Sequence, residues 1–435
     1  MQSVLKKIAI FVLALALIAA FGCKGDTPPT QTDEQGMQTT NPPGQTAPAE
    51  AEDPDIGEEV ASLFGSIEDI EKYDGENAVR IMLSDSGADC ASDAVTTDEG
   101  KVRITQAGTY IISGRLADGV LTVNAGDSDR VVLVLDGAEI SSAADSAVKL
   151  KNAGSVVIIL PNGTTNAICS TAQAETDADT HAAMSVHTGL IIAGSGALEI
   201  SSASGNGIKA DGAMLITSGE YRLSSAKHGI KAAELYILGG SFELESELDG
   251  IHVDGKDTEL SGSLGIAEGS NISIADGEFN ELRTGDDAVS AVGSLVIESG
   301  SFVIPYCYEG LEATSVTIRS CSIDIISSDD GINAADDDDD SRDPFKASTD
   351  NFVIIDSGSL TIVSEGDCID SNGDIIVNGG TLRLTCGGNG NTAIDASGSF
   401  TNNGGDVTTN DGSESGNMGG PGGMGGGKPG GMGRP

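Results

Sequence analysis

Carboxylic acids recur at one register of this 435-residue sequence, each two residues before an aliphatic residue, at intervals of 21 to 38 residues. If equivalent positions stack about 4.8 Å apart, neighbouring carboxylates repel by roughly 3–4 kcal/mol at an effective dielectric near 20. This repulsion either raises the pKa values of the carboxylic acids or is relieved by bound cations. Carboxylate oxygens are hard ligands, which suit Ca²⁺. The alternative is that Asp before Gly only forms turns. The predicted calcium ligands are Asp249, Asp286, Asp287, Glu309, Asp329, Asp330, Asp367 and Asp370.

A second polar column stands directly after the same aliphatic residues and runs from basic to acidic along the chain. Strand alternation turns these side chains outward if the aliphatic residues point inward. Lys and His can meet sugar carboxylates, Ca²⁺ can bridge sugars to acids, and a tyrosine can stack on a sugar ring. An ordinary solvated face is the alternative. The predicted carbohydrate-binding residues are Lys209, Lys231, His252, Glu312, Tyr306 and Tyr308; no catalytic residue is predicted.

The elements that position these residues are the strands of an internal repeat. One apolar column occupies positions 198, 221, 242, 279, 302, 323, 360 and 382, and a second occupies 208, 230, 251, 289, 311, 332, 369 and 394. Three successive members of the first column recur after 81 residues, which indicates two tandem three-coil units. Period-2 strands with Gly, Asn and Asp corners predict an all-β, single-stranded parallel β-helix with coils of about 21–25 residues.

The charge balance narrows the choice of partners. The chain has 23 Lys and Arg residues against 67 Asp and Glu residues, a formal net charge of −44. Phosphate binding needs a basic surface, so the composition excludes nucleic acid as the expected partner and favours cations. With no Trp and 3% aromatic residues, a flat aromatic platform for sugars is disfavoured as well.

The two ends of the chain differ from the repeat. Residues 1–22 have the positive start and short apolar run of a signal peptide, and the small residues before Cys23 predict cleavage and lipidation there. An ordinary signal peptide, followed by full secretion, is the alternative. Residues 23–56 predict a flexible tether, 57–411 the β-helix domain and 412–435 a Gly/Met/Pro-rich tail. We expect a protein anchored by lipid to the extracellular face of the cell membrane.

Several short motifs in sequence order resemble a bacterial family of carbohydrate-binding domains. They include Gly-Thr-Tyr at 108–110, Leu-Asp-Gly at 135–137, Pro-Asn-Gly-Thr-Thr-Asn at 161–166, Gly-Ile-Lys-Ala-Asp-Gly at 207–212 and Asp-Asp-Gly-Ile-Asn-Ala at 329–334. The likeness covers about residues 75–411. The resemblance implies a right-handed parallel β-helix like that of pectate lyases, with bound calcium and affinity for cellulose or acidic, pectin-like glycan.

Three functions are consistent with these features of the sequence. The first is a non-catalytic, monomeric surface lipoprotein that binds polysaccharide on a calcium-loaded β-helix and touches the membrane only through its lipid. The second is a calcium-dependent polysaccharide lyase on uronic acids, which needs a base beside the metal; Lys209, Lys231 and Arg283 are the candidates. The third is a structural or adhesive surface protein that binds calcium but no glycan.

Overall fold

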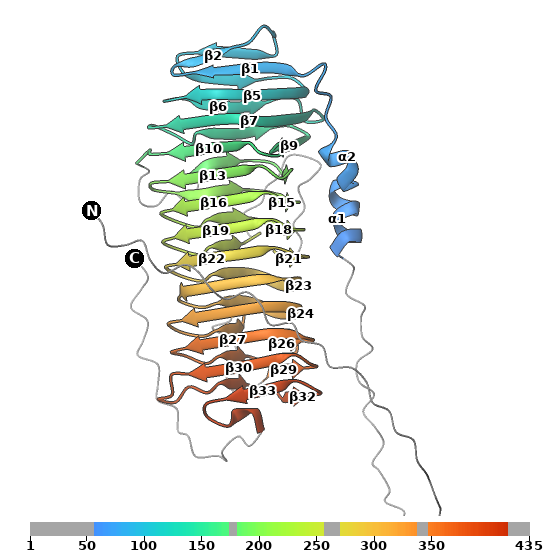
Figure 1. Ribbon diagram of the computed structural model, residues 1–435, viewed down its shortest axis with the longest axis vertical. Coiled ribbons are helices and arrows are strands. Elements are labelled where there is room, and N and C mark those ends of the chain that lie inside the picture. The colour runs from blue at the N-terminus through green and yellow to red at the C-terminus, as the bar shows by residue number, and fades with distance from the viewer. Residues whose placement is uncertain (1–55, 174–180, 256–269, 337–346, 416–435) are drawn as a thin grey trace, which may run out of the picture. The chain divides into compact units, whose positions relative to one another are not determined.

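Three parallel β-sheets form the sides of a coil that the chain repeats along the axis of the domain (Figure 1). The structure is a computed structural model that describes residues 56–173, 181–255, 270–336 and 347–415. The predicted all-β parallel β-helix is confirmed. The predicted signal peptide, Cys23, the tether up to residue 55 and most of the tail lie outside the described residues. Within the described ranges, no helix is both long and apolar enough to cross a membrane.

Each sheet takes one strand from each coil. Sheet 1 contains β10 (Thr165–Ser170), β13 (Ala197–Ser202), β16 (Glu220–Ser225), β19 (Ser241–Ser246), β22 (Glu278–Thr284), β27 (Gly358–Ser364), β30 (Thr381–Cys386) and β33 (Asp406–Thr409). Sheet 2 contains β4 (Lys101–Ile104), β6 (Val120–Asn124), β8 (Val148–Asn152), β11 (Ala182–Val186), β14 (Asn206–Ala210), β17 (Ile230–Ala232), β20 (Ile251–Val253), β25 (Ile332–Ala334), β28 (Ile369–Ser371) and β31 (Ile394–Ala396). Sheet 3 contains β9 (Ser155–Ile159), β12 (Leu190–Ala193), β15 (Ala213–Ile216), β18 (Glu234–Ile237), β21 (Ile272–Ile274), β26 (Phe352–Ile355), β29 (Asp374–Val377) and β32 (Phe400–Asn402).

Four long strands bend through the corners and join the sheets. β5 (Gly108–Leu116) and β7 (Arg130–Ser142) run from sheet 3 into sheet 1. β23 (Val289–Cys307) and β24 (Leu311–Ser327) pass through sheets 2, 3 and 1 in turn. A 3-10 turn, η1 (Ser413–Ser415), follows the last strand.

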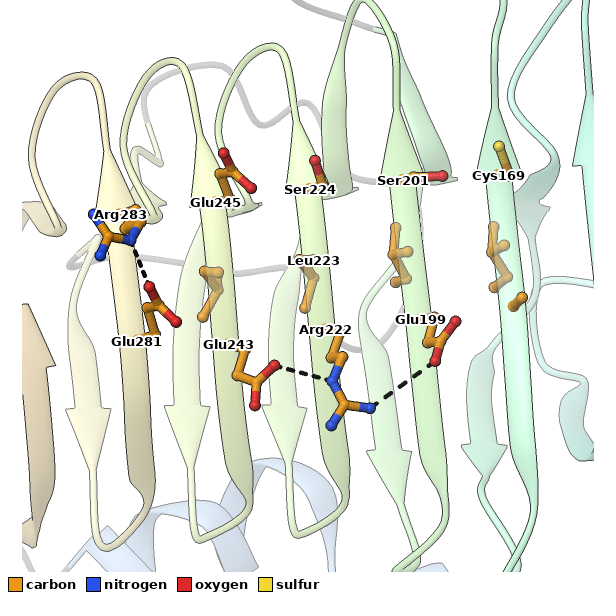
Figure 2. Close-up of a pocket in the computed structure, with 14 residues that line it drawn as sticks. Cys169, Glu199, Ser201, Arg222, Leu223, Ser224, Glu243, Glu245, Glu281 and Arg283 are labelled. Carbon is orange, nitrogen blue, oxygen red and sulfur yellow. Dashed lines mark hydrogen bonds and ion pairs between the residues drawn. The ribbon is translucent and has the colours of Figure 1, made fainter. Parts of the chain in front are cut away.

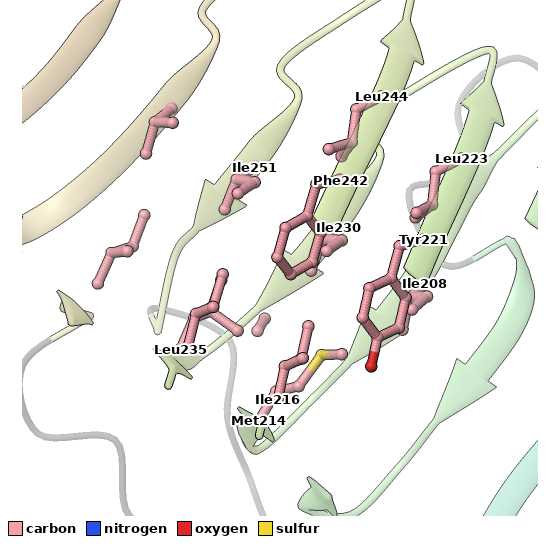
Figure 3. Packing of buried hydrophobic residues seen from close by; sticks show 14 of the residues in the cluster. Ile208, Met214, Ile216, Tyr221, Leu223, Ile230, Leu235, Phe242, Leu244 and Ile251 are labelled. Carbon is pink, nitrogen blue, oxygen red and sulfur yellow. The ribbon is translucent and has the colours of Figure 1, made fainter. Parts of the chain in front are cut away.

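Both predicted apolar columns form the core of the coil, because strand pairing puts their members directly beside one another. In sheet 1 the rings of Tyr221, Phe242, Phe279 and Phe302 stack with centroids 4.9, 4.7 and 4.3 Å apart. Figure 3 shows the first two of these rings among the buried aliphatic residues around them. In sheet 2 the column runs in register from Ile208 to Ile394. Stacked aromatic pairs contribute about 0.5–1.5 kcal/mol beyond their buried area, so this column ties successive coils together.

The amino-terminal part of the domain covers two otherwise open surfaces. The antiparallel pairs of β1 (Val79–Ser84) with β2 (Gly87–Asp89), and of β3 (Val95–Asp98) with β4, lie at the first coil. Helices α1 (Ile56–Phe64) and α2 (Ile67–Glu71) pack on outward-facing apolar residues of sheet 3. Phe64 meets the ring of Tyr236 edge-on at 5.7 Å, and the Tyr236 hydroxyl donates a hydrogen bond to Glu59 at 2.8 Å.

The turn between sheets 1 and 2 is tight enough to require glycine. A Cβ atom on Gly250 would lie 2.7 Å from the carbonyl oxygen of Ala288 in the next coil, and real Cβ atoms do not come so close to an oxygen.

The described cysteines form no disulfide. Cys307, Cys321, Cys368 and Cys386 are buried free thiols, whereas Cys90 and Cys169 are free and partly exposed.

Candidate functional site

The predicted carboxylate column lies at the turn from sheet 1 to sheet 2, and each member bonds to the next coil. Asp249 Oδ1 accepts the backbone N–H of Asp287 at 3.0 Å, and Asp287 Oδ1 accepts that of Glu309 at 3.1 Å. Asp330 Oδ1 accepts the N–H of Asp367 at 2.7 Å. One oxygen of each of these aspartates therefore accepts a backbone N–H of the next coil.

Four groups of side chains along this corner each bring three potential ligand atoms within 4.8 Å of one another. Three groups contain only carboxylates, and one contains two histidines. Every predicted calcium ligand except Asp329 belongs to one of them. Asp329 instead lies near the Tyr308 hydroxyl, and this proximity raises the pKa of Tyr308. These groups could bind metal ions. They are Asp249–Asp286–Asp287, Asp287–Glu309–Glu312, Asp330–Asp367–Asp370 and His228–Asp249–His252.

Burial and crowding perturb the acids at the centre of the corner. Burial raises the pKa of Glu309 to about 8, and the nearby charge of Glu312 adds to the shift. Burial also raises the pKa of Asp287, and the charges of Asp249 and Glu312 push it in the same direction. A divalent cation at this position would reverse both effects, because an adjacent positive charge favours the ionised carboxylate.

The predicted polar column is contiguous on the outward face of sheet 2. Strand pairing aligns Lys209 with Lys231, and Lys231 with His252, and the column continues to Glu312. All four side chains are partly buried. Lys209 Nζ lies 2.5 Å from Asp211 Oδ1, and Glu312 accepts a hydrogen bond from the Ser290 hydroxyl at 3.1 Å. This face is therefore largely occupied with its own polar contacts.

A groove of about 640 Å³ opens instead on the outer face of sheet 1 (Figure 2). Arg222 lies at its centre, with Nε 2.9 Å from Glu243 Oε2 and Nη1 4.0 Å from Glu199 Oε1. Arg283 Nε lies 2.5 Å from Glu281 Oε1 on β22, two coils beyond Arg222. With Glu245, the lining holds two arginines and four glutamates, a net charge of −2.

The two predicted tyrosines lie on different parts of the surface. Tyr306 pairs with Arg283 across strands of sheet 1, and it is 55% exposed at the end of the groove. Ile326 and Val363, also exposed, continue the outward face of the same sheet beyond it. Tyr308 lies at the corner, where its hydroxyl contacts Asp329. The predicted carbohydrate-binding residues therefore divide between two sides of the coil.

Except for Arg283, which the sequence offered as a candidate lyase base, the groove residues were not predicted from the sequence, although a signal for them exists. Glu199, Arg222 and Glu243 each stand between two buried apolar residues of a sheet 1 strand, at one register. This outward column alternates in charge, which allows an ion pair between one coil and the next.

The region that matches known proteins includes the coils that line the groove. A family model described as "Carbohydrate-binding domain-containing protein" matches residues 98–337 and 282–428. The chain belongs to this family. A carbohydrate-binding domain-containing protein from Acetivibrio thermocellus is 30% identical over 131 residues, which are 29% of this chain and 46% of that protein. This chain thus spans about half the length of that relative.

Among solved structures, this family member is similar to one described as a polysaccharide lyase-like protein from C. thermocellum, a gadolinium derivative. The similarity has a TM-score of 0.46 with 23% sequence identity, and it covers 57% of this chain and 94% of the other. The predicted resemblance to the carbohydrate-binding domain family is confirmed by the family model.

Proposed function

We propose that this chain is a non-catalytic polysaccharide-binding protein, with the glycan along the outer face of sheet 1 and calcium at the carboxylate corner. The observation that carries the proposal is that the matched family region includes every coil that lines the groove. We further propose lipid attachment at Cys23, which would hold the domain at the extracellular cell surface.

The chemistry of the groove suits sugar hydroxyls. Arg222 and Arg283 present several N–H donors, and the adjacent glutamates present acceptors, so both partners of a hydroxyl group are available. Tyr306 adds an exposed aromatic ring at one end, the kind of apolar surface that packs against a sugar. The net charge of −2 disfavours a bare polyanion. A neutral, cellulose-like chain therefore fits directly, and an acidic, pectin-like chain needs a cation as a bridge.

The carboxylate corner suits calcium. Ca²⁺ binds carboxylate oxygens at about 2.3–2.6 Å, so two oxygens on opposite sides of the ion are up to about 5 Å apart. The three oxygen groups meet this limit, with their ligand atoms within 4.8 Å. Burial and the charge of Glu312 raise the pKa of Glu309, and a bound calcium ion would supply a positive charge that favours the ionised carboxylate.

Catalysis is left out of the proposal. A lyase needs an unprotonated base beside the metal. Lys209 is instead engaged in an ion pair, with its Nζ 2.5 Å from Asp211 Oδ1.

The test incubates the full chain with cellulose and with polygalacturonate, each in calcium and in chelator, and measures retention together with absorbance of unsaturated products. We expect retention on cellulose in all conditions, calcium-dependent retention on polygalacturonate, and no absorbance change. Rising absorbance would instead establish a lyase. Calcium binding without retention on either glycan would contradict the proposal and favour the structural protein.

A further inference from the structure

One group at the corner differs in chemistry from the three oxygen groups, because it contains two imidazoles. His228 comes from the coil before Asp249 and His252, and sheet 2 pairs Lys231 with His252 to set the two coils in register. The rings of His228 and His252 stack with centroids 4.4 Å apart and planes 21° apart. Imidazole nitrogen is a ligand of zinc, nickel and copper rather than of calcium.

Both rings direct the same nitrogen toward one carboxylate oxygen. Asp249 Oδ2 lies 2.7 Å from His252 Nδ1 and 3.2 Å from His228 Nδ1. Ligand atoms placed about 2.0–2.1 Å from a tetrahedral zinc ion are themselves about 3.3 Å apart. The existing separations are therefore close to those of a metal-ligand set, and small side-chain rotations would complete it.

His228 supplies an independent reason to expect a ligand. Its residue surface is 8% exposed, yet Nδ1 is buried without a hydrogen-bond partner among the described residues, since its contact with Asp249 is not aligned for a hydrogen bond. A buried polar atom without a partner costs about 1–3 kcal/mol. A metal ion bound to Nδ1 would remove this cost.

The backbone already orients the three side chains. The other carboxylate oxygen of Asp249 accepts the N–H of Asp287 at 3.0 Å, and the N–H of His228 bonds to Asn206 Oδ1 at 3.2 Å. Such outer contacts fix ligand geometry in metal sites. Lys231, adjacent to His252 on sheet 2, adds a positive charge nearby that reduces the affinity for a cation.

We propose that His228, Asp249 and His252 form a site for one divalent transition-metal ion of the zinc class, which shares Asp249 with one of the three oxygen groups. Three protein ligands leave the fourth position of a tetrahedral ion to water. The proposal does not rest on glycan binding, because it follows from the ligand set alone.

The test is zinc calorimetry on the full chain without a polyhistidine tag, in excess calcium to fill the two oxygen groups that do not contain Asp249. We expect one zinc ion per chain in the wild type and at least a tenfold loss of affinity in both His228→Asn and His252→Asn. The matched control is His187→Asn, since His187 pairs with the single carboxylate of Asp211 at 2.7 Å. This control should bind zinc as the wild type does.

Cobalt provides a second readout that does not depend on affinity. Tetrahedral Co²⁺ with histidine ligands gives intense visible absorbance, which we expect in the wild type and in His187→Asn but not in His252→Asn. The His252 side chain is 17% exposed and asparagine keeps a hydrogen-bond donor there, so this variant should remain folded, which its melting temperature in chelator checks. Unchanged zinc stoichiometry and affinity in the folded His252→Asn variant, or displacement of zinc by millimolar calcium, would overturn the proposal.

Discussion

The raised pKa of Glu309 predicts an unusual dependence of stability on pH. In the folded chain this pKa rises from 4.5 to about 8, so the folded state holds the proton more tightly than the unfolded state does. Stability therefore falls as pH rises from about 4.5 through about 8. A shift from 4.5 to about 8 corresponds to on the order of 5 kcal/mol, all of which is lost above the upper value.

Glu309→Gln removes this titration and keeps the local contact, because glutamine can still accept the hydrogen bond that Asn333 Nδ2 donates at 3.0 Å. The assay is urea unfolding in chelator at pH 5 and pH 9. We expect the wild type to lose several kcal/mol of unfolding free energy across this range. The loss in the variant should be smaller than that in the wild type by up to about 5 kcal/mol. Excess calcium should restore the wild type at pH 9.

The matched control is Glu220→Gln, an exposed glutamate on β16 that belongs to none of the four ligand groups. It should reproduce the wild-type pH dependence. If Glu309→Gln loses as much stability between pH 5 and pH 9 as the wild type, the electrostatic description of the corner is wrong.

Three further predictions concern the core, the groove and the corner. Phe279→Ala should lower the unfolding free energy by about 3–5 kcal/mol in urea titrations, because the ring stacks on both neighbouring coils; a loss below about 1 kcal/mol would contradict the role of the stack. Tyr306→Ala should weaken glycan retention in affinity gels several-fold at an unchanged melting temperature, with exposed Tyr73→Ala as its control. Asp330→Asn should reduce the number of calcium ions bound in calorimetry, and an unchanged count would remove Asp330 from the ligand set.

The apolar columns could be predicted from the sequence because each coil brings the chain back to the same position around the axis. A residue such as Phe279 then pairs with its equivalents Phe242 and Phe302, and the spacing alone identifies them. The position of the carboxylate column followed for the same reason. Its hydrogen bonds did not, because the acceptor contact of Asp249 is to a backbone N–H, which every residue type except proline carries.

The groove was not predicted from the sequence because packing does not constrain outward residues, and their alternating charges are the only sign of them in the repeat. The ion pair between Arg222 and Glu243 can be recognised only when the strand register places the two residues side by side. Tyr306 shows a second limit. The pairing of β23 with β24 shifts between Ile304 and Cys307, and this irregularity, invisible in the repeat pattern, accompanies the outward placement of Tyr306 on sheet 1.

The central claim is that polysaccharide binds along the outer face of sheet 1, and it is tested most directly by the double variant Arg222→Ala/Arg283→Ala. Both arginines are exposed, so their ion pairs add at most about 1 kcal/mol each to stability, and the variant should fold. The measurement is the binding isotherm of the full chain on cellulose in calcium, with exposed Arg103→Ala on sheet 2 as control. We expect at least a tenfold loss of affinity in the double variant and wild-type affinity in the control. Wild-type affinity in the folded double variant would contradict the claim.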